Sequence, residues 1–158
     1  VAASGPNPRQ DDYRFLTTSK AKRITGLKLE ILPQNGVLSR GKSGEFILTD
    51  LKLQVSRLGS TQVRDILIKN AVADAQAESK TREYGDVKGT LDDDPRNGWT
   101  TKGSPKDKPY QALYELAEPL VLESAGHFVQ EWGDKVATEA LLHFEVTPGK
   151  RRIRRSAL

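Results

Sequence analysis

The fold is decided by ten consecutive residues, Phe46-Ile47-Leu48-Thr49-Asp50-Leu51-Lys52-Leu53-Gln54-Val55. Apolar and polar residues alternate here, which is the period of a β-strand with one buried face. Five of these residues are candidates for the core. Phe46 and Leu48 have even numbers, whereas Leu51, Leu53 and Val55 have odd numbers. Because successive strand side chains point to opposite faces, all five enter one core only if the strand contains an extra residue near Thr49-Asp50. The stretch therefore predicts a long strand with a bulge.

Other segments show the same alternation and are separated by turn residues. Leu27, Leu29 and Ile31 alternate with Lys28 and Glu30. Further strands are predicted at 12–17, 63–69, 110–116, 128–132 and 140–146. Segment 71–83 lacks the wide apolar stripe of a packed helix, so we expect a strand end followed by an exposed loop. Seven to nine short strands with dense Pro, Gly and Asn turns predict an all-β, antiparallel β-sandwich of the jelly-roll kind.

Length and composition restrict the class of protein. The 158 residues suit one domain, expected at 1–148, followed by a basic tail or linker at 149–158. Cysteine and methionine are absent, so this chain forms no disulfide, thiolate metal site or covalent haem attachment. No apolar run approaches the roughly 20 residues of a membrane-spanning helix. We expect neither haem nor a membrane span in this chain.

The positive charge is concentrated at one end. The formal net charge is +4, but Lys150, Arg151, Arg152, Arg154 and Arg155 lie in the last nine residues. The rest of the chain carries 20 basic and 21 acidic residues. Nucleic-acid binding requires basic residues that cluster on a face together with stacking aromatics. A nucleic-acid partner is therefore not expected.

The sequence presents no recognisable catalytic arrangement. His127 and His143 are the only histidines, and no nucleophile elbow, His-x-x-x-His pair or glycine-rich phosphate loop accompanies them. A strand residue such as His143 is more commonly structural than catalytic. We expect a domain without enzymatic activity.

The most informative turn is Asp92-Asp93-Asp94-Pro95-Arg96-Asn97-Gly98-Trp99. Asp92, Asp94 and Asn97 supply closely spaced oxygen atoms, which are the ligands that calcium prefers. The alternative is that these side chains only cap and solvate a tight turn, as is common for Asp and Asn. The turn is thus a candidate structural calcium site. Trp99, at the start of the next segment, is expected in the core.

Residues within reach of loops are candidates for ligand binding. Aromatic rings match the apolar face of a sugar, and loops at the end of a sandwich commonly carry function. The candidates are Trp132, Tyr84, Arg96, Tyr110 and His127. Trp132 is the first of these to test, because Glu131-Trp132-Gly133-Asp134 places it where a predicted strand runs into a loop.

Several motifs together resemble a known module. They are Ala3-Ser4-Gly5-Pro6-Asn7-Pro8 with Asp12-Tyr13, residues 24–33, residues 44–50, the turn 92–99, Tyr114-Glu115-Leu116-Ala117-Glu118-Pro119-Leu120 and His143-Phe144-Glu145-Val146-Thr147. In this order they resemble a β-sandwich module of large planctomycete proteins that also carry c-type-cytochrome-like and uncharacterised conserved domains. The later part is similar to discoidin and galactose-binding-like carbohydrate modules. The chain departs from the family at Glu45, Asn97 and Leu142-His143, where Asn, Thr and Gly-Arg are usual.

This resemblance implies a location and two functions. It implies a non-catalytic, extracytoplasmic module, periplasmic or at the cell surface, that attaches a larger protein to a polysaccharide. The alternative is a structural or protein-interaction domain in a multidomain cytochrome-associated assembly, with neighbouring domains as partners. Family members usually have a strand-forming segment before the Ala3 to Pro8 motif. The resemblance thus raises the alternative that an N-terminal edge strand comes from another part of the parent or from another chain.

Overall fold

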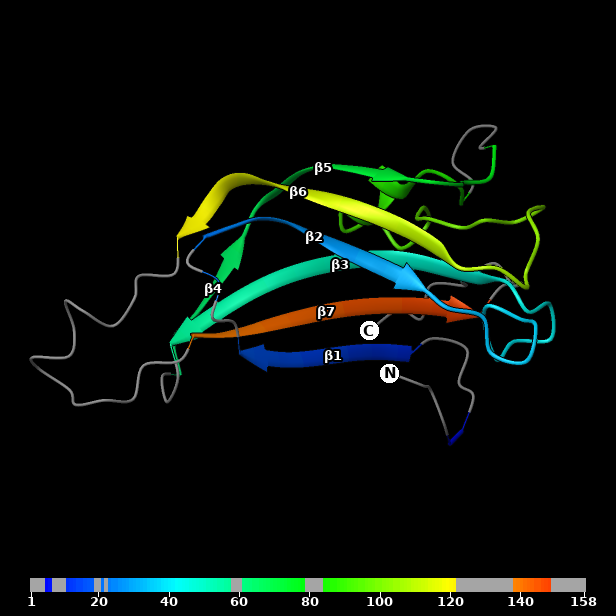
Figure 1. Cartoon of the computed structure of the whole chain (residues 1–158), viewed down its shortest axis with the longest axis horizontal. Helices are drawn as coiled ribbons and strands as arrows, with labels where there is room; N and C mark the ends of the chain where they lie inside the picture. The colour runs from blue at the N-terminus through cyan, green and yellow to red at the C-terminus, as the bar shows by residue number, and fades with distance from the viewer. Residues whose placement is uncertain are drawn as a thin grey trace, which may run out of the picture.

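The computed structural model describes residues 5–6, 11–18, 21, 23–57, 61–78, 84–121 and 138–148. These residues form antiparallel strands and one short 3₁₀-helix (Figure 1). The elements are β1 (Asp11–Thr18), β2 (Arg23–Ile31), β3 (Phe46–Arg57), β4 (Val63–Ile66), β5 (Ile68–Ala73), η1 (Val87–Thr90), β6 (Tyr110–Val121) and β7 (Thr138–Pro148). The predictions of an all-β chain and of low helix content are confirmed for the described residues. None of their helices is long and apolar enough to cross a membrane.

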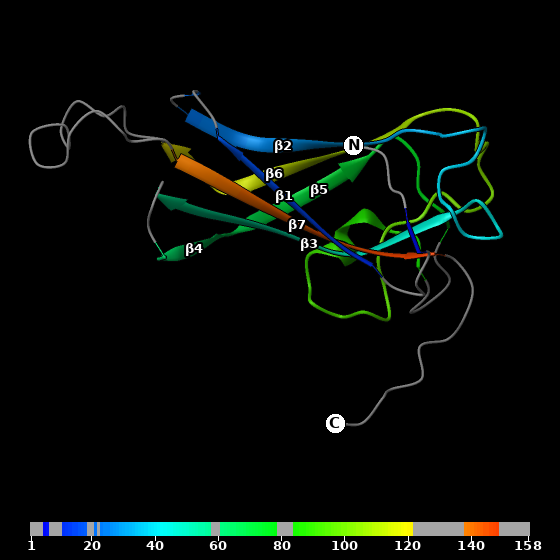
Figure 2. The same cartoon turned by 90° about the horizontal axis from the view of Figure 1, so that it is seen from below.

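The strands form two sheets that share a core. One sheet has the order β1-β7-β3-β4, and the other has the order β2-β6-β5. Figure 2 shows β1 and β7 of the first sheet crossing β6 and β5 of the second at an angle. Every pair of neighbouring strands is antiparallel. Buried side chains of β3 contact those of β5 and β6, as in the cluster of Phe46, Leu48, Ala71 and Tyr114. The core therefore lies between the two sheets.

Strand β3 contains the bulge that its sequence predicts. The pairing of β3 with β7 shifts register between Leu48 and Asp50. The alternating apolar residues on both sides of the shift are all buried, at 1 to 8% exposure: Phe46, Leu48, Leu51, Leu53 and Val55. One extra residue in the strand thus brings both the even-numbered and the odd-numbered apolar residues to the same face.

The prediction of one strand over residues 63–69 is wrong. The chain forms β4 in the first sheet and β5 in the second, with Leu67 between them. The Leu67 side chain is 74% exposed, and its carbonyl accepts a hydrogen bond from Ala117 N at 2.8 Å. Because the connection contains no Gly or Pro, the sequence carried no breaker signal for this crossover. Beyond β5, residues 74–78 form a non-helical connection, as expected for the described part of segment 71–83.

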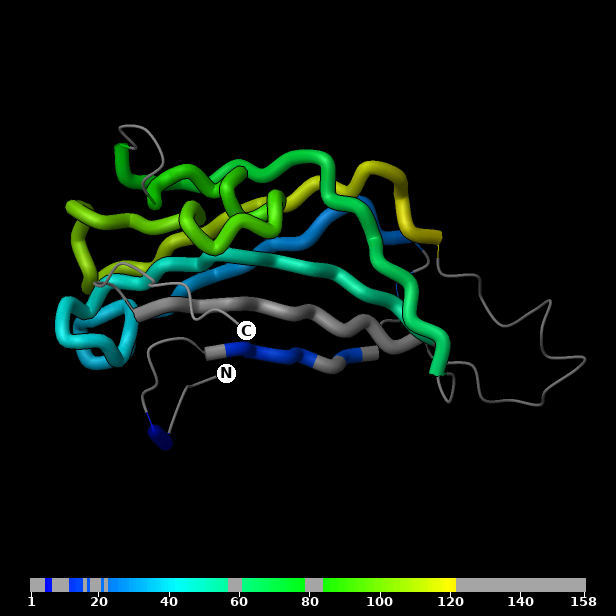
Figure 3. Tube along the Cα trace, turned by 180° about the vertical axis from the view of Figure 1, so that it is seen from behind, coloured from blue at the N-terminus to red at the C-terminus, as the bar shows by residue number. Residues whose placement is uncertain are grey.

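The element η1 packs against β3 of one sheet and β5 of the other. Figure 3 shows the chain around η1 between β5 and β3. Val87 and Thr90 of η1 are buried, and Asp86 caps its start by accepting a hydrogen bond from Lys88 N at 2.9 Å. Short 3₁₀ segments of this kind serve as connectors. This one is followed closely by the aspartate-rich turn at residues 92–98. The predicted strand at 128–132 and the basic tail lie outside the described residues.

Candidate functional site

The aspartate turn, residues 92–98, is anchored to β3 by Trp99. Trp99 N donates to Leu48 O at 2.8 Å, and Leu48 N donates to Trp99 O at 2.9 Å. The indole is fully buried, and its Nε1 donates a hydrogen bond to Ala75 O at 2.8 Å. It packs edge-to-face with the Phe46 ring, with 4.9 Å between the ring centres. The prediction that Trp99 is a core residue is confirmed. The turn is thus held at its end by a rigid anchor.

Gly98 permits the turn to lie directly on the bulge of β3. Its φ is +142°, and a Cβ built at this position would lie 2.3 Å from Leu48 O and 2.8 Å from Thr49 Cα. No side chain fits at these distances, so glycine is required by both space and conformation. This close approach brings the turn onto the β3 backbone.

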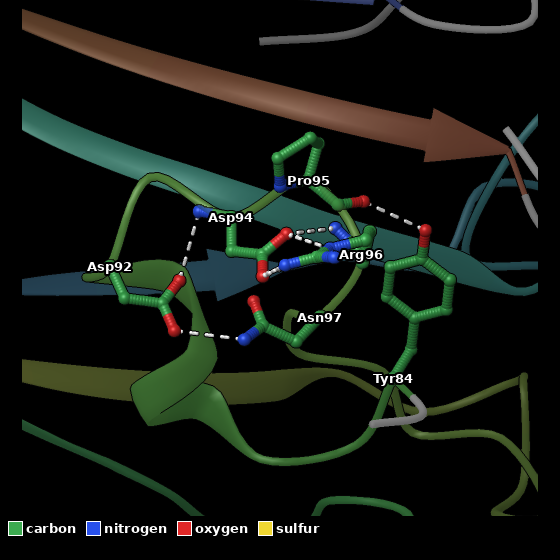
Figure 4. Close-up of polar contacts among 6 residues, drawn as sticks. All are labelled: Tyr84, Asp92, Asp94, Pro95, Arg96 and Asn97. Carbon is green, nitrogen blue, oxygen red and sulfur yellow. Dashed lines mark hydrogen bonds and ion pairs between the residues drawn. The ribbon is translucent and has the colours of Figure 1, made fainter. Parts of the chain in front are cut away.

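Within the turn, the aspartates satisfy backbone and side-chain donors (Figure 4). Asp92 accepts from Asp94 N at 3.1 Å through Oδ1 and from Asn97 Nδ2 at 2.8 Å through Oδ2. Asp93, at φ +57°, forms an ion pair with Lys52 of β3. The hydrogen bond to Asp93 is the main reason that the pKa of Lys52 is raised above its ordinary value. The capping role considered for these aspartates is therefore present.

Asp94 and Arg96 form a two-pronged ion pair on the exposed side of the turn. Arg96 Nε lies 2.7 Å from Asp94 Oδ1, and a terminal guanidinium nitrogen lies 2.5 Å from Oδ2. The Arg96 side chain is 68% exposed and that of Asp94 is 30% exposed. The hydrogen bonds that Arg96 donates to the Asp94 carboxylate raise the pKa of Arg96. The pair presents a charged carboxylate and guanidinium in a fixed relative orientation.

Tyr84 lies against the same turn. Its hydroxyl donates to Pro95 O at 2.9 Å, which places the phenol next to the residue that precedes Arg96 (Figure 4). The ring is half-buried. The structure thus brings together two of the predicted ligand-binding residues, Tyr84 and Arg96, with the three predicted metal ligands.

The candidate calcium ligands differ in whether their oxygen atoms already accept hydrogen bonds. Both carboxylate oxygens of Asp94 accept from Arg96, whereas Asn97 Oδ1 is a buried oxygen atom with no hydrogen-bond partner. In the described ranges, no three His, Cys, Asp or Glu side chains form a group that would hold a metal ion. Asp92 and Asn97 remain oriented oxygen donors. Asp94 is less available than these two, because its carboxylate accepts from both the side chain and the backbone N of Arg96.

The other predicted ligand-binding residues lie elsewhere. Tyr110 is 2% exposed and donates from its hydroxyl to Pro105 O at 2.6 Å, with Lys108 Nζ 5.2 Å from its ring centre. Its ring packs in the core and offers no open stacking face. His127 and Trp132 lie outside the described residues. Sequence reasoning missed Lys52, because strand alternation only marked it as solvent-facing and gave no sign of the distant Asp93.

Comparison with known proteins adds no assignment. No protein-family model matches the chain, and no solved structure matches it.

Proposed function

We propose that this domain binds a polysaccharide without catalysing a reaction, and so attaches a larger extracytoplasmic protein to it. The observation that carries the proposal is the exposed Asp94–Arg96 pair on a turn anchored by Trp99. A carboxylate accepts hydrogen bonds from sugar hydroxyls, and a guanidinium donates to them. Because internal hydrogen bonds already orient both groups, little side-chain freedom is lost on binding.

The proposal also covers the type of β-sandwich and two aromatic residues. We infer a jelly-roll sandwich of the discoidin-like, galactose-binding-like kind, supported by two antiparallel sheets around a shared core and by the sequence resemblance. Tyr84 next to the pair supplies a ring edge. From the sequence alone, we propose Trp132 as a residue that stacks on a sugar ring. Calcium at Asp92 and Asn97 would stiffen the turn and is not needed for the hydrogen bonds themselves.

The experiment is a glycan array followed by affinity measurement with the isolated domain. Arg96→Gln should weaken binding to the selected glycan at least tenfold. Lys28→Gln is the matched control, because Lys28 forms another solvent-exposed ion pair, with Glu30 at 2.8 Å on strand β2. Trp132→Ala should abolish binding while leaving the melting temperature nearly unchanged. The absence of any retained glycan, or equal losses for Arg96→Gln and Lys28→Gln, would refute sugar binding at this turn.

A second function is favoured by a separate observation. Val72 of β5 and Leu113 of β6 are cross-strand partners and are 52% and 50% exposed on the outer face of their sheet. Exposed apolar pairs are favourable contact points for another protein surface. The corresponding proposal is a structural domain that docks on a neighbouring domain of its parent. Leu113→Lys should then loosen the parent, seen as faster limited proteolysis between domains, without changing glycan binding.

A further inference from the structure

A hollow lies between the end of β5 and the start of η1. Its volume is about 500 Å³, within the range of small-molecule sites. It is lined by Ala71, Val72, Ala73, Asp74, Ala75, Gln76, Asp86, Val87 and Lys88. The aspartate turn follows at the other end of η1, so the two features are joined by one short connector.

The lining separates into an apolar floor and a polar rim. Ala71 and Val87 are buried, and Ala73 and Ala75 are half-buried. The four exposed polar residues of the rim are Asp74, Gln76, Asp86 and Lys88. Small apolar side chains below a ring of polar groups are the usual composition of a ligand site.

Three rim side chains are oriented by the backbone. Asp74 Oδ1 accepts from Gln111 N at 3.1 Å, and Gln76 Oε1 accepts from Val87 N at 3.3 Å. Asp86 Oδ1 accepts from Lys88 N at 2.9 Å. Each bond uses one oxygen and leaves the second polar atom of that side chain for a ligand. The wall is fixed as well, because the Trp99 indole donates to Ala75 O.

The chemistry of these remaining groups defines the ligand. The second oxygens of Asp74 and Asp86 accept hydrogen bonds, whereas Gln76 Nε2 and Lys88 Nζ donate them. A neutral molecule with several neighbouring hydroxyls satisfies all four, because each hydroxyl both donates and accepts. Two carboxylates with one lysine do not supply the oxygen ligands that a bare calcium ion requires.

We infer that this hollow is a second binding site, which holds a single neutral hexose unit. The choice of a sugar rests on the proposed function, whereas the location is independent of the aspartate turn. A polysaccharide would then be held at two places along η1, and the two contacts would strengthen each other through their high effective concentration.

The test is a titration of the ¹⁵N-labelled chain with galactose and, separately, glucose, followed by amide chemical shifts. Amides of residues 74–76 and 86–88 should shift and saturate as sugar reaches about 100 mM, which would fill most of a site with a Kd near 10 mM. Lys88→Met should raise the Kd at least fivefold. Lys102→Met is the control, because Lys102 is an exposed lysine of another loop. Unchanged remote amides verify that each variant is folded.

The other outcomes separate this inference from the proposed function. Shifts confined to Tyr84, Arg96 and Asn97 would overturn the second site and leave sugar binding at the turn intact. Saturable shifts at the hollow with methylguanidinium, but with neither sugar, would overturn the hexose assignment. A Lys88→Met variant that binds as well as the wild type would also overturn it.

Discussion

At the scale of single residues, two buried positions control how the aspartate turn meets the core. Gly98 allows the turn to lie on Leu48 and Thr49. Tyr114 of β6 is fully surrounded, and its hydroxyl oxygen lies 3.3 Å from Thr90 Oγ1, which itself donates to Val87 O at 2.7 Å. These contacts tie η1 to β6 and the aspartate turn to β3, and each leads to a prediction.

Gly98→Ala should destabilise the domain strongly. The new Cβ meets the Leu48 carbonyl, so the backbone must shift and the paired hydrogen bonds of Leu48 and Trp99 break. We expect a loss of at least about 3 kcal/mol in the free energy of unfolding, from strain and overpacking together. Gly103→Ala is the control, since φ is +89° but nothing lies within 4 Å of its Cβ, and it should cost about 1 kcal/mol. Urea denaturation measures both, and equal losses would contradict the proposed clash.

Tyr114 should make stability depend on alkaline pH. Burial raises its pKa from 10 to about 12, while the Thr90 hydroxyl lowers it in part. The raised pKa in the folded state means that the phenol's contribution is complete below pH 10 and is lost as pH rises towards 12. The loss should reach about 2 to 3 kcal/mol. Urea denaturation at about pH 9 and about pH 11.5 should show this loss, and Tyr114→Phe should reduce it. An identical pH dependence in Tyr114→Phe would assign the effect to other groups.

At the scale of elements, the sequence predicted strands well and their connections poorly. The bulge of β3 followed from parity alone, because five apolar residues of mixed parity had to reach one core. The crossover at Leu67 and the 3₁₀-helix η1 were not predicted, since their shapes depend on distant partners such as Ala117 and Tyr114. For the same reason, the turn was recognised from its aspartates, but the pairing of Asp94 with Arg96 was not.

The aspartate turn should respond to calcium more strongly when Arg96 is removed. Arg96→Ala removes the guanidinium from both oxygens of Asp94, while the backbone N of residue 96 still donates to Oδ1 at 3.1 Å. Asp94 Oδ2 can then turn towards Asp92 and Asn97 Oδ1. A ligand that binds only the folded state raises the melting temperature by mass action. Added calcium should thus raise, and a chelator lower, the melting temperature more in Arg96→Ala than in the wild type. Lys28→Ala should respond like the wild type. Identical melting of Arg96→Ala with calcium and with chelator would favour a turn that functions without metal.

At the scale of the whole molecule, the described residues already join all seven strands into two sheets. Strand β7 ends at Pro148, which pairs with Phe46 at the start of β3. The residues from 149 onwards hold two large apolar side chains, Ile153 and Leu158, and five cationic ones. A charged segment of this composition is expected to contribute little to a core.

Truncation after Gly149 should therefore leave the fold intact. We expect the melting temperature to change by less than about 5 °C, which corresponds to about 1 to 2.5 kcal/mol for a domain of this size. Truncation after Leu141 is the contrasting variant, because it removes most of the pairing between β7 and both of its neighbours and should prevent cooperative unfolding. A large drop after the Gly149 truncation would show that the tail packs against the domain.

The central position of β7 also has a consequence for synthesis on the ribosome. Among the described strands, β2, β6 and β5 have all emerged once residue 121 has left the exit tunnel, but β1 and β3 lie on either side of β7, which emerges later. Until then, the apolar face of β3 is exposed, and the edges of β1 and β3 that pair with β7 lack this partner. Exposed edges and apolar faces of this kind are the surfaces that chaperones protect during translation. The nascent domain should therefore remain a chaperone client until β7 has emerged.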